Sequence, residues 1–345
     1  MKYRIALIRG DGIGPEQVEA ALPLLEKLQE FLGLSLEIVE AKAGDGCFEE
    51  LGTPLPEETI DILKNSHACL KGPVGETAAD VIVKLRQLFD LYANVRPARS
   101  LPNVPSLKPG IDLVIVRENT EGLYKGCEFE FDDIAIGLRI ITRRGCERIA
   151  RYAFELARRR RKKLVAVHKA NVMRRTCGLF AKVCREISKD YQDVSYSEMY
   201  VDAAAMNLIR KPEEFDVIVT TNMFGDILSD EAAQVVGGLG LAPAANIGDD
   251  YAIFEPVHGC APDIAGKGVA NPTSLILSAA MMLDWLGEKY SDDKCVQAST
   301  MLNKAVEEAL RAGRALTPDL GGRASTKEFG NEVARILEEL LSGKA

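Results

Sequence analysis

The chain has 345 residues, 47% of them hydrophobic and 27% charged, which is typical of a globular protein with two domains or one large α/β body. Its formal net charge of −8 argues against nucleic-acid binding, and no apolar run approaches the roughly 20 residues that a membrane helix needs. Eight cysteines without a C-x-x-C pair, and an N-terminus without a signal-peptide pattern, predict reduced thiols and a cytoplasmic location.

The first predicted strand, Tyr3–Ile8, runs into the glycine-rich stretch RGDGIGPE at residues 9–16. A Rossmann fingerprint has the spacing G-x-G-x-x-G, whereas here the third glycine comes one residue early and Pro15 follows it. Because proline suits the first position of a helix, a strand, a tight turn and a helix are predicted instead. Glu40, in the next apolar run LSLEIVEA, stands at roughly the distance of a ribose-binding acid, but the glycine spacing argues against that role.

Strand-like and helical segments alternate along the chain, which predicts an α/β fold with much parallel sheet. Further strands are predicted at residues 36–41, 68–70, 111–117, 164–168 and 215–221, and helices at 146–161 and 173–189. Two turn-rich stretches, residues 100–110 and 237–248, are predicted crossovers. The basic run ARRRRKK at 157–163 is interpreted as a solvated helix end, because cations suit that end of the helix dipole and the chain is acidic overall.

Three arginines stand at the ends of predicted elements. Arg86 and Arg96 lie in the otherwise apolar stretch LRQLFDLYANVRP, and Arg117 ends the strand IDLVIV. Guanidinium groups bind carboxylates through two parallel hydrogen bonds, so three of them suggest a di- or tricarboxylate ligand. For any one arginine, a structural ion pair is the simpler interpretation.

Two acids on one helix face form a candidate metal site. In TTNMFGDILSDEAAQ, residues 220–234, Asp226 and Asp230 are four residues apart and share a helix face. Oxygen ligands at this spacing suit Mg²⁺ or Mn²⁺, and Asp202 in MYVDAAAMN is a candidate third ligand. Two solvated acids at a helix start would give the same pattern, and the spacing alone does not decide between the two.

Two further stretches carry residues suited to acid–base chemistry or ligand binding. Lys169 directly follows the buried-type strand LVAVH, where desolvation would make a lysine a usable base. Tyr124 in ENTEGLY is a candidate proton donor, although a tyrosine alone more often serves packing. The long turn-rich segment FEPVHGCAPDIAGKGVANP, residues 254–272, is of the kind that often carries function.

Taken together, GDGIGPE, FDLYANVRP, VRENTEGLY, HKANV, TTNMFGDILSD and EPVHGCAPDIAGKGVANP resemble the motifs of the β-decarboxylating dehydrogenases of 3-substituted malates. That family includes isopropylmalate, isocitrate, homoisocitrate and tartrate dehydrogenases, and the resemblance extends to TPDLGG at 317–322. It implies an isopropylmalate dehydrogenase-like fold, not a true Rossmann fold, with two α/β domains and a deep cleft. The large domain would comprise residues 1–94 and 237–345, and the small domain residues 95–236.

The same resemblance implies the roles of individual residues. Tyr124, Lys169 and Asp226 would be catalytic; Val83, Arg86, Arg96, Arg117, Tyr124, Lys169 and Asn171 would bind the substrate; Asp202, Asp226 and Asp230 would bind Mg²⁺ or Mn²⁺. The cofactor would contact Ile13, Glu255, His258, Gly259, Ala261, Asp263, Ile264 and Asn271. It would be NAD, because the Asp263 carboxylate would repel the 2′-phosphate of NADP. Asp202 and Lys169 would reach the site from a neighbouring subunit, so a homodimer is expected, or a tetramer, with no nucleic-acid or membrane partner.

The implied reaction is an oxidative decarboxylation. Lys169 would take the proton of the C2 hydroxyl, hydride would pass to the nicotinamide, and Tyr124 would protonate C3 after loss of CO₂. Val83 would face the variable group of the substrate, and its apolar side chain suits an isopropyl group although the surrounding motifs resemble the homoisocitrate branch. We therefore predict an enzyme of lysine and leucine biosynthesis that accepts both homoisocitrate and 3-isopropylmalate. A dedicated 3-isopropylmalate dehydrogenase, an isocitrate dehydrogenase and a non-catalytic regulatory subunit are the alternatives.

Overall fold

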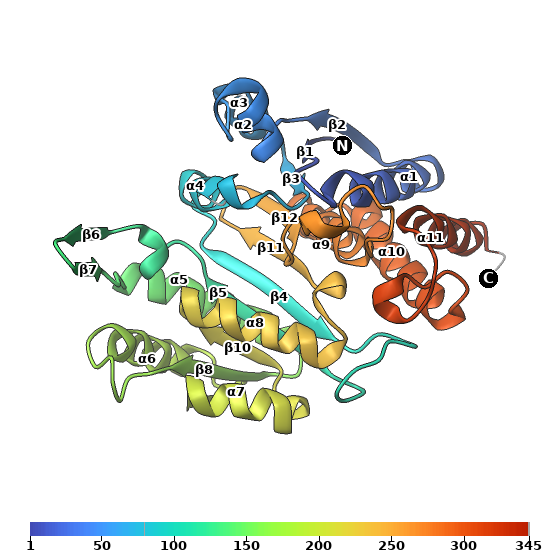
Figure 1. Cartoon of the computed structure of the whole chain (residues 1–345). Helices are drawn as coiled ribbons and strands as arrows, with labels where there is room; N and C mark the ends of the chain where they lie inside the picture. Colours follow the sequence, from blue (N-terminus) through green and yellow to red (C-terminus); the bar gives the residue numbers. More distant parts are fainter. Residues whose placement is uncertain (79, 344–345) are drawn as a thin grey trace.

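The computed structural model describes residues 1–78 and 80–343, which form a ten-stranded sheet with helices on both faces and a separate two-stranded hairpin (Figure 1). The strands are β1 Lys2–Ile8, β2 Ser35–Glu40, β3 Ala68–Lys71, β4 Ala93–Arg99, β5 Asp112–Glu118, β6 Glu128–Phe131, β7 Ile134–Gly137, β8 Lys163–His168, β9 Ser195–Tyr200, β10 Val217–Thr220, β11 Pro243–Ile247 and β12 Ala252–Pro256. The helices are α1 Gly14–Leu32, α2 Asp45–Leu51, α3 Glu57–Lys64, α4 Asp80–Leu88, α5 Arg143–Arg158, α6 Thr176–Ile187, α7 Val201–Arg210, α8 Asn222–Val236, α9 Thr273–Tyr290, α10 Asp293–Ala312 and α11 Thr326–Leu341.

The strand order of the large sheet is β2-β1-β3-β12-β11-β4-β5-β10-β8-β9. Strands β2, β1, β3 and β12 are parallel to one another, and so are β5, β10, β8 and β9. Between these two parallel groups, β11 and β4 make antiparallel pairs with each other and with their outer neighbours. The predicted α/β fold with much parallel sheet is therefore confirmed, and the hairpin β6–β7 projects away from the sheet (Figure 1).

The two faces of the sheet are covered differently. Because successive side chains of a strand point to opposite faces, Val217 and Val219 of β10 pack in one cluster and Ile218 in another. The first cluster is continuous and includes residues of α1, α5, α6, α9, α10 and α11. The opposite face has two separate apolar clusters, one beneath α3 and α4 and one beneath α7 and α8. The interval between these two clusters positions the candidate site.

The predicted elements agree with the structure with one clear exception. The prediction of a turn-rich crossover at residues 237–248 is wrong, because the second half of this segment forms strand β11, whose five residues are all buried. Small side chains and Pro243 are typical of a turn, but antiparallel pairing with β4 and β12 makes this segment a central strand. Segment 100–110 does form an irregular connection, between β4 and β5. Strands β4, β6, β7, β9 and β12 were not among the predicted elements.

Three bulk features of the chain are seen in the structure, namely its basic run, its apolar helices and its cysteines. In the basic run 157–163, the partly exposed Arg158 pairs with Asp193, as expected for a solvated helix end, whereas Arg160 is largely buried and pairs with the buried Asp216. No helix among the described residues is long and apolar enough to cross a membrane. All eight cysteines are free, and six of them are buried.

Candidate active site

A row of buried polar side chains crosses the sheet on the face that carries α4 and α8. The row consists of Lys71 on β3, Glu255 on β12, Asn246 on β11, Asn94 and Arg96 on β4, and Arg117 on β5, and each is at most 7% exposed. Each one alternates along its strand with an apolar residue of the opposite face, such as Leu70 before Lys71 and Val116 before Arg117. The row fills the interval between the two apolar clusters of this face. Burying charges in this way is costly unless they are paired or meet a ligand.

Arg96 and Arg117 converge on one carboxylate of helix α8. Arg117 Nη1 and Arg96 Nη1 both donate to Asp226 Oδ1, the latter at 3.1 Å. Arg117 Nε also donates to Asn222 Oδ1 at 2.9 Å, but its Nη2 is buried without a hydrogen-bond partner. Burial and the neighbouring Arg96 and Arg86 charges lower the pKa of Arg117, so this cluster favours an incoming anion.

Tyr124 joins the same cluster from the short helical turn Leu123–Lys125 that follows β5. Its hydroxyl donates to Asp226 Oδ2, and the Arg117 guanidinium lies over its ring, 5.0 Å from the centroid. Burial and the hydrogen bond to Asp226 raise the pKa of Tyr124. The hydroxyl therefore keeps its proton at neutral pH and is a suitable acid.

Asp226 and Asp230 present two carboxylates on one side of α8. Arg96 Nη1 lies 3.1 Å from Asp226 Oδ1 and 3.4 Å from Asp230 Oδ1, so the two acids face a common space. Burial alone would raise the pKa of Asp226, but Arg117 and Arg96 lower it below its usual range, which keeps it ionised. Burial raises the pKa of Asp230. A divalent cation between these oxygens would favour the ionised form of both, so the pair suits Mg²⁺ or Mn²⁺.

Lys169 and Asp202 lie together but apart from this cluster. Lys169 Nζ contacts Asp202 Oδ1 at 2.6 Å, at the carboxyl ends of β8 and β9, and the Asp202 side chain is 67% exposed. Within the part of the chain that the structure describes, no three His, Cys, Asp or Glu side chains are close enough to hold a metal ion. Asn171, two residues after Lys169, is also exposed. Lys169 and Asp202 thus form a group of their own, separate from the cluster of Arg96, Arg117, Tyr124 and Asp226.

The other end of the polar row holds Arg86 and Glu255. Glu255 Oε2 accepts from Lys71 Nζ at 2.8 Å, and Glu255 Oε1 lies 3.5 Å from Arg86 Nη2. Burial alone would raise the pKa of Glu255, but the Lys71 and Arg86 charges and hydrogen bonds from Lys71 and Asn246 lower it to about 2. Glu255 is therefore ionised at every pH at which the protein is expected to work.

His258 follows β12 in the predicted cofactor segment and is held as a neutral ring. Its Nδ1 lies 2.9 Å from the Gly259 carbonyl, which only accepts, so Nδ1 carries the proton. Its Nε2 then accepts from Gln17 Nε2 at 3.1 Å and from the Ser274 hydroxyl at 2.9 Å. Burial lowers the pKa of His258, which agrees with this assignment.

The glycine-rich turn after β1 packs against the same segment. Ile13 N donates to the Cys260 carbonyl at 2.9 Å. A Cβ on Gly12 would lie 2.0 Å from that carbonyl oxygen, and one on Gly10 would lie 1.9 Å from the Pro73 oxygen. Both glycines also have positive φ. The glycines therefore allow close backbone packing beside the predicted cofactor segment.

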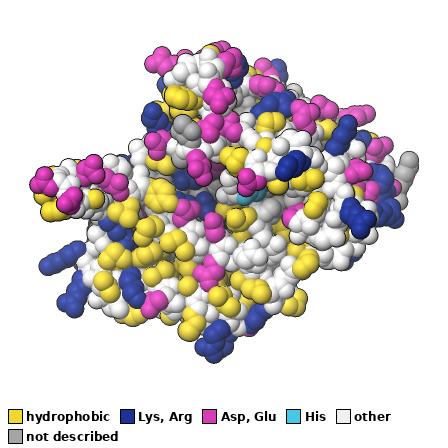
Figure 2. All heavy atoms as spheres, in the orientation of Figure 1, with side chains coloured by type: hydrophobic (Ala, Val, Ile, Leu, Met, Phe, Trp, Pro, Cys, Tyr) yellow, Lys and Arg dark blue, Asp and Glu magenta, His cyan; other side chains and the backbone are white. Residues whose placement is uncertain are grey.

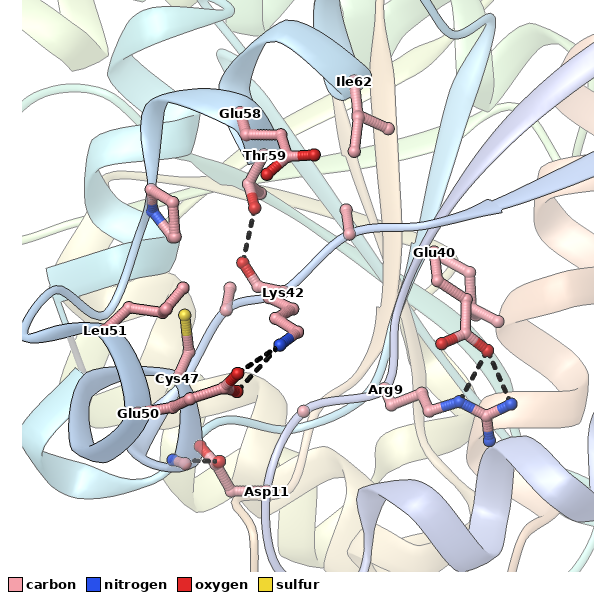
Figure 3. Close-up of a pocket in the computed structure, with 16 residues that line it drawn as sticks. Arg9, Asp11, Glu40, Lys42, Cys47, Glu50, Leu51, Glu58, Thr59 and Ile62 are labelled. Atoms are coloured by element: carbon pink, nitrogen blue, oxygen red, sulfur yellow. Dashed lines mark hydrogen bonds and ion pairs between the residues drawn. The ribbon is translucent and has the colours of Figure 1, made fainter.

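Glu40 is not free to bind a ribose (Figure 3). It ends β2 beside a cavity of about 440 Å³ between β1, β2, α2 and α3, and Arg9 binds its carboxylate at 2.7 Å. Asp11 points to the other side of that cavity and accepts from the backbone of Asp45 and Gly46. None of the predicted site residues lines this cavity.

Two larger cavities meet along the segment after β12. A cavity of about 660 Å³ is lined by Lys71, Ile82, Arg86, Arg96 and Glu255, and one of about 650 Å³ by Ile13, Gln17, Ile264, Asn271 and Asp319. They share His258, Gly259 and Ala261. One cavity thus contains arginines and the other the predicted cofactor residues, which is the arrangement that a two-substrate site needs.

Of the predicted ligand contacts, Asn271 lines one of these cavities, whereas Val83 and Asp263 are not among their lining residues. Val83 is half-buried on α4, whereas Ile82, one turn before Arg86, lines the arginine cavity. Asp263 is exposed in the turn that follows Ala261. Asn271 lines the second cavity, where its Nδ2 donates to Asp319 Oδ2 at 2.9 Å.

Sequence reasoning missed Lys71, Ile82, Asn246 and Gln17. Lys71 and Asn246 are single polar residues within the apolar runs ACLKG and AANIG, and a lone polar residue in a buried strand is a usable signal for a site. Gln17 lies one turn after the glycine-rich stretch, and Ile82 follows the apolar pattern of an ordinary helix. Only the packing of α1 and α4 against the segment after β12 distinguishes these two.

Known proteins share both the sequence and this fold. Residues 4–333 match the family model described as isocitrate/isopropylmalate dehydrogenase. The chain is 55% identical to 3-isopropylmalate dehydrogenase of Archaeoglobus fulgidus, over 97% of this chain and 99% of the relative. It is 52% identical to isocitrate/homoisocitrate dehydrogenase of Thermus thermophilus, over 99% of this chain and all of the relative. The crystal structure of isocitrate dehydrogenase from Methylococcus capsulatus superposes with a TM-score of 0.91 at 44% identity, covering 97% of this chain and 99% of that one.

Proposed function

Because the chain belongs to the isocitrate/isopropylmalate dehydrogenase family of β-decarboxylating oxidoreductases, we propose that it catalyses the NAD- and divalent-metal-dependent oxidative decarboxylation of a 3-substituted malate. We propose 3-isopropylmalate and homoisocitrate as its substrates. The observation that carries the proposal is the convergence of Arg96, Arg117 and Tyr124 on Asp226, with Arg117 Nη2 buried and unpaired. A substrate carboxylate would satisfy that nitrogen.

Three arginines are proposed to bind the substrate carboxylates. Arg86 and Arg96 both line the cavity of about 660 Å³, and Arg117 lies beside Arg96 through their shared carboxylate. Guanidinium groups fix a carboxylate in one orientation, which sets the C2 and C3 atoms relative to Tyr124. Ile82 and the neighbouring Val83 would face the variable group at C3, and both side chains suit an apolar substituent.

Asp226 and Asp230 are proposed to hold Mg²⁺ or Mn²⁺ together with Asp202 of a second copy of the chain. Two carboxylates that face one space, and a third that is 67% exposed on another part of the surface, are the donor set of such a shared site. When bound, the cation supplies Lewis-acid stabilisation of negative charge on the substrate oxygens.

The residues of the second cavity are proposed to bind NAD, which accepts the hydride. Neutral His258 offers no positive charge to a phosphate, and Asp263 is exposed at the edge of the segment where it would repel a 2′-phosphate. Ile264 and Asn271 line the same cavity. This combination favours NAD over NADP.

Two side chains are proposed to move the protons. Lys169 accepts the proton of the C2 hydroxyl while hydride leaves C2, and the resulting 3-carboxy-2-oxo acid loses CO₂ from C3. Tyr124 then donates its proton to C3, a role that its protonated hydroxyl beside Asp226 and its position beside Arg117 support. Since the chain keeps Lys169, Tyr124 and all three aspartates, the residues give no support to a regulatory subunit.

The test of the proposed function is the turnover of three acids by the purified protein. We expect kcat/KM for 3-isopropylmalate and homoisocitrate to agree within about tenfold, isocitrate to be weaker, and NAD to be preferred to NADP. Steady-state kinetics with Mn²⁺ and each nicotinamide measure all of these values. A preference of about a hundredfold for one acid would instead name a dedicated enzyme, and NADP preference would contradict the role of Asp263.

We also propose that the domains divide as residues 1–94 with 237–345 and residues 95–236. The sheet order supports this division, because β2, β1, β3, β12 and β11 lie on one side of β4, and β5, β10, β8 and β9 lie on the other. The active site would then lie at the junction, where β4 carries Asn94 and Arg96. A cytoplasmic location is proposed for the enzyme, since that compartment keeps free thiols reduced.

A homodimer with shared sites is proposed as the active unit. Exposed hydrophobic side chains lie on α7 and α8 and on the β6–β7 hairpin, and Figure 2 shows hydrophobic side chains gathered over α7 and α8. They include Met206, Ile209, Ile227, Phe129 and Phe131. A second copy that covers this surface would bury them and bring its own Lys169 and Asp202 to the site.

Mixing two inactive variants tests this arrangement directly. Lys169→Ala and Asp226→Asn should each be inactive as homodimers, for different missing groups. In a mixed dimer with shared sites, one site combines the native Asp226 of one chain with the native Lys169 of the other, so activity should return to about half of the parent value. Co-expression with two affinity tags isolates the mixed dimer. If each site lies within one chain, every site lacks one group and the mixed dimer stays inactive.

A further inference from the structure

A single buried amide joins the two charged groups at the substrate–cofactor junction. Asn246 lies on the central strand β11 and is 0% exposed. Its Oδ1 accepts from Arg86 Nε at 2.9 Å, and its Nδ2 donates to Glu255 Oε1 at 2.8 Å. The direct contact between Arg86 Nη2 and Glu255 is longer, at 3.5 Å. The amide therefore makes the shorter contacts between the two groups.

The orientation of this amide follows from its partners. Oδ1 accepts from three donors. They are Arg86 Nε at 2.9 Å and the side-chain amides of Asn94 and Asn119, both at 3.0 Å. Nδ2 faces two acceptors, the Glu255 carboxylate and the Ile253 carbonyl at 3.3 Å. Reversing the amide would set oxygen against oxygen and nitrogen against nitrogen, so only one orientation is compatible with the site.

The network also extends to the second arginine of the cavity. Asn94 donates to Asn246 and accepts from Arg96 Nε at 3.1 Å. Arg86 and Arg96 are thus oriented through their Nε atoms by two neighbouring strands, and Asn94 pairs with Asn246 in the strand register. Each guanidinium keeps its other nitrogens for the cavity or for acids nearby.

We propose that Asn246 is a positioning residue that fixes the Arg86 guanidinium relative to the Glu255 carboxylate. It thereby fixes the position of the substrate-binding side of the cleft relative to the cofactor-binding side. The proposal rests on the proposed function, which assigns Arg86 to the substrate and Glu255 to the cofactor. An asparagine fits this position because it donates on one side and accepts on the other without charge. Serine is too short to reach both partners, and aspartate lacks the donor.

The charges around Glu255 come from two other elements. Lys71 of β3 and Arg86 of α4 face its carboxylate, and both are positive. The Cys69 thiol of β3 is neutral, because burial raises its pKa to about 12. From α9, the Ser278 hydroxyl donates to the backbone carbonyls of Glu255 and Ser274, and His258 on the following segment is neutral. A second carboxylate at position 246 would therefore face Glu255 directly.

Two substitutions at this position test the proposal. For Asn246→Ser, we expect KM for the acid and KM for NAD each to rise at least about tenfold, with kcat within about threefold of the parent. For Asn246→Asp, the new carboxylate still accepts from Arg86 but opposes Glu255, and two adjacent carboxylates share a proton at low pH. The kcat/KM for NAD of N246D, relative to the parent, should therefore increase as pH falls from about 9 to about 6. The same ratio for N246S should not depend on pH.

Asn303→Asp makes the same chemical change on α10, where the Asn303 amide donates to Ser299, and should leave all constants unchanged. Thermal melting shows whether each variant folds. If N246D does not fold, the KM values of N246S alone test the proposal. Parent-like KM values in folded N246S, or a parent-like pH profile in folded N246D, would overturn the role of Asn246.

If the parent turns over none of the three acids, the proposed function fails. Calorimetry with NAD alone then decides the role of Asn246, and an unchanged Kd in N246S rejects it.

Discussion

Replacing Asp226 with Asn is expected to lower kcat by about 1,000-fold or more, which is about 4 kcal/mol of transition-state stabilisation. Arg96, Arg117 and Tyr124 all contact the Asp226 carboxylate, whose pKa is lowered by Arg117 and Arg96, whereas burial raises the pKa of Asp230. An amide keeps an acceptor for Arg117 but removes the negative charge that a divalent cation requires. The loss should appear in kcat and in the Mn²⁺ concentration at half-maximal activity.

The matched control lies on the next turn of the same helix. Glu231→Gln removes one charge from α8 at a half-buried acid that lies one residue beyond Asp230. This variant should keep parental kcat and Mn²⁺ dependence. Mn²⁺ binding, measured by electron paramagnetic resonance without substrate, separates a lost metal from a lost proton donor. Unchanged Mn²⁺ affinity in folded D226N would remove Asp226 from the metal site.

Much of the site could be predicted because its residues stand at the ends of strands. Arg117, Lys169 and Asp226 follow or end the buried runs of β5, β8 and β10, and parallel neighbours place their carboxyl ends at one edge of the sheet. The spacing of Asp226 and Asp230 also placed both acids on one helix face. These inferences need only local pattern and the rule for parallel strands.

The rest of the site depends on contacts that no local pattern contains. Asn246 lies in a segment whose proline and small residues resemble a turn, and only its antiparallel pairing with β4 brings it to Asn94. Lys71 meets Glu255, 184 residues later in the chain, because β3 and β12 are neighbours in the sheet. The separation of Asp202 from Asp226 is likewise a matter of strand order, since β8 lies between β9 and β10.

The order of the strands also explains why the site has one exposed and one buried half. Strands β5 and β10 lie inside the sheet, and Arg117 of β5 is buried beneath α8, where it contacts Asn222 and Asp226. Strand β9 is an edge strand, and Asp202 lies in the first turn of α7, the helix that follows it at the periphery. A metal site that needs both halves can be completed by a second copy, whose edge would cover the exposed face of α7 and α8.

Arg117→Lys is expected to lower kcat/KM for the acid by about 100- to 1,000-fold, or about 3 to 4 kcal/mol, chiefly through KM. Lysine keeps the positive charge, but one ammonium group replaces a planar fork that now contacts Asn222 and Asp226 and leaves Nη2 for a carboxylate. KM for NAD should change by less than about threefold, because Arg117 lies in the half of the site formed by β5 and α8. Steady-state kinetics with the best acid of the parent measure both constants.

The control for Arg117 is another largely buried arginine whose role is structural. Arg160 pairs with Asp216 and Asp112 at the opposite ends of β5 and β10, and Arg160→Lys should lower the melting temperature without a change in either KM. If R117K instead lowers the melting temperature and keeps parental KM, Arg117 is a structural ion pair, the simpler interpretation that its sequence context allowed. A rise in KM for the acid without a lower melting temperature would show that Arg117 binds the substrate carboxylate and is not only an ion-pair partner of Asp226.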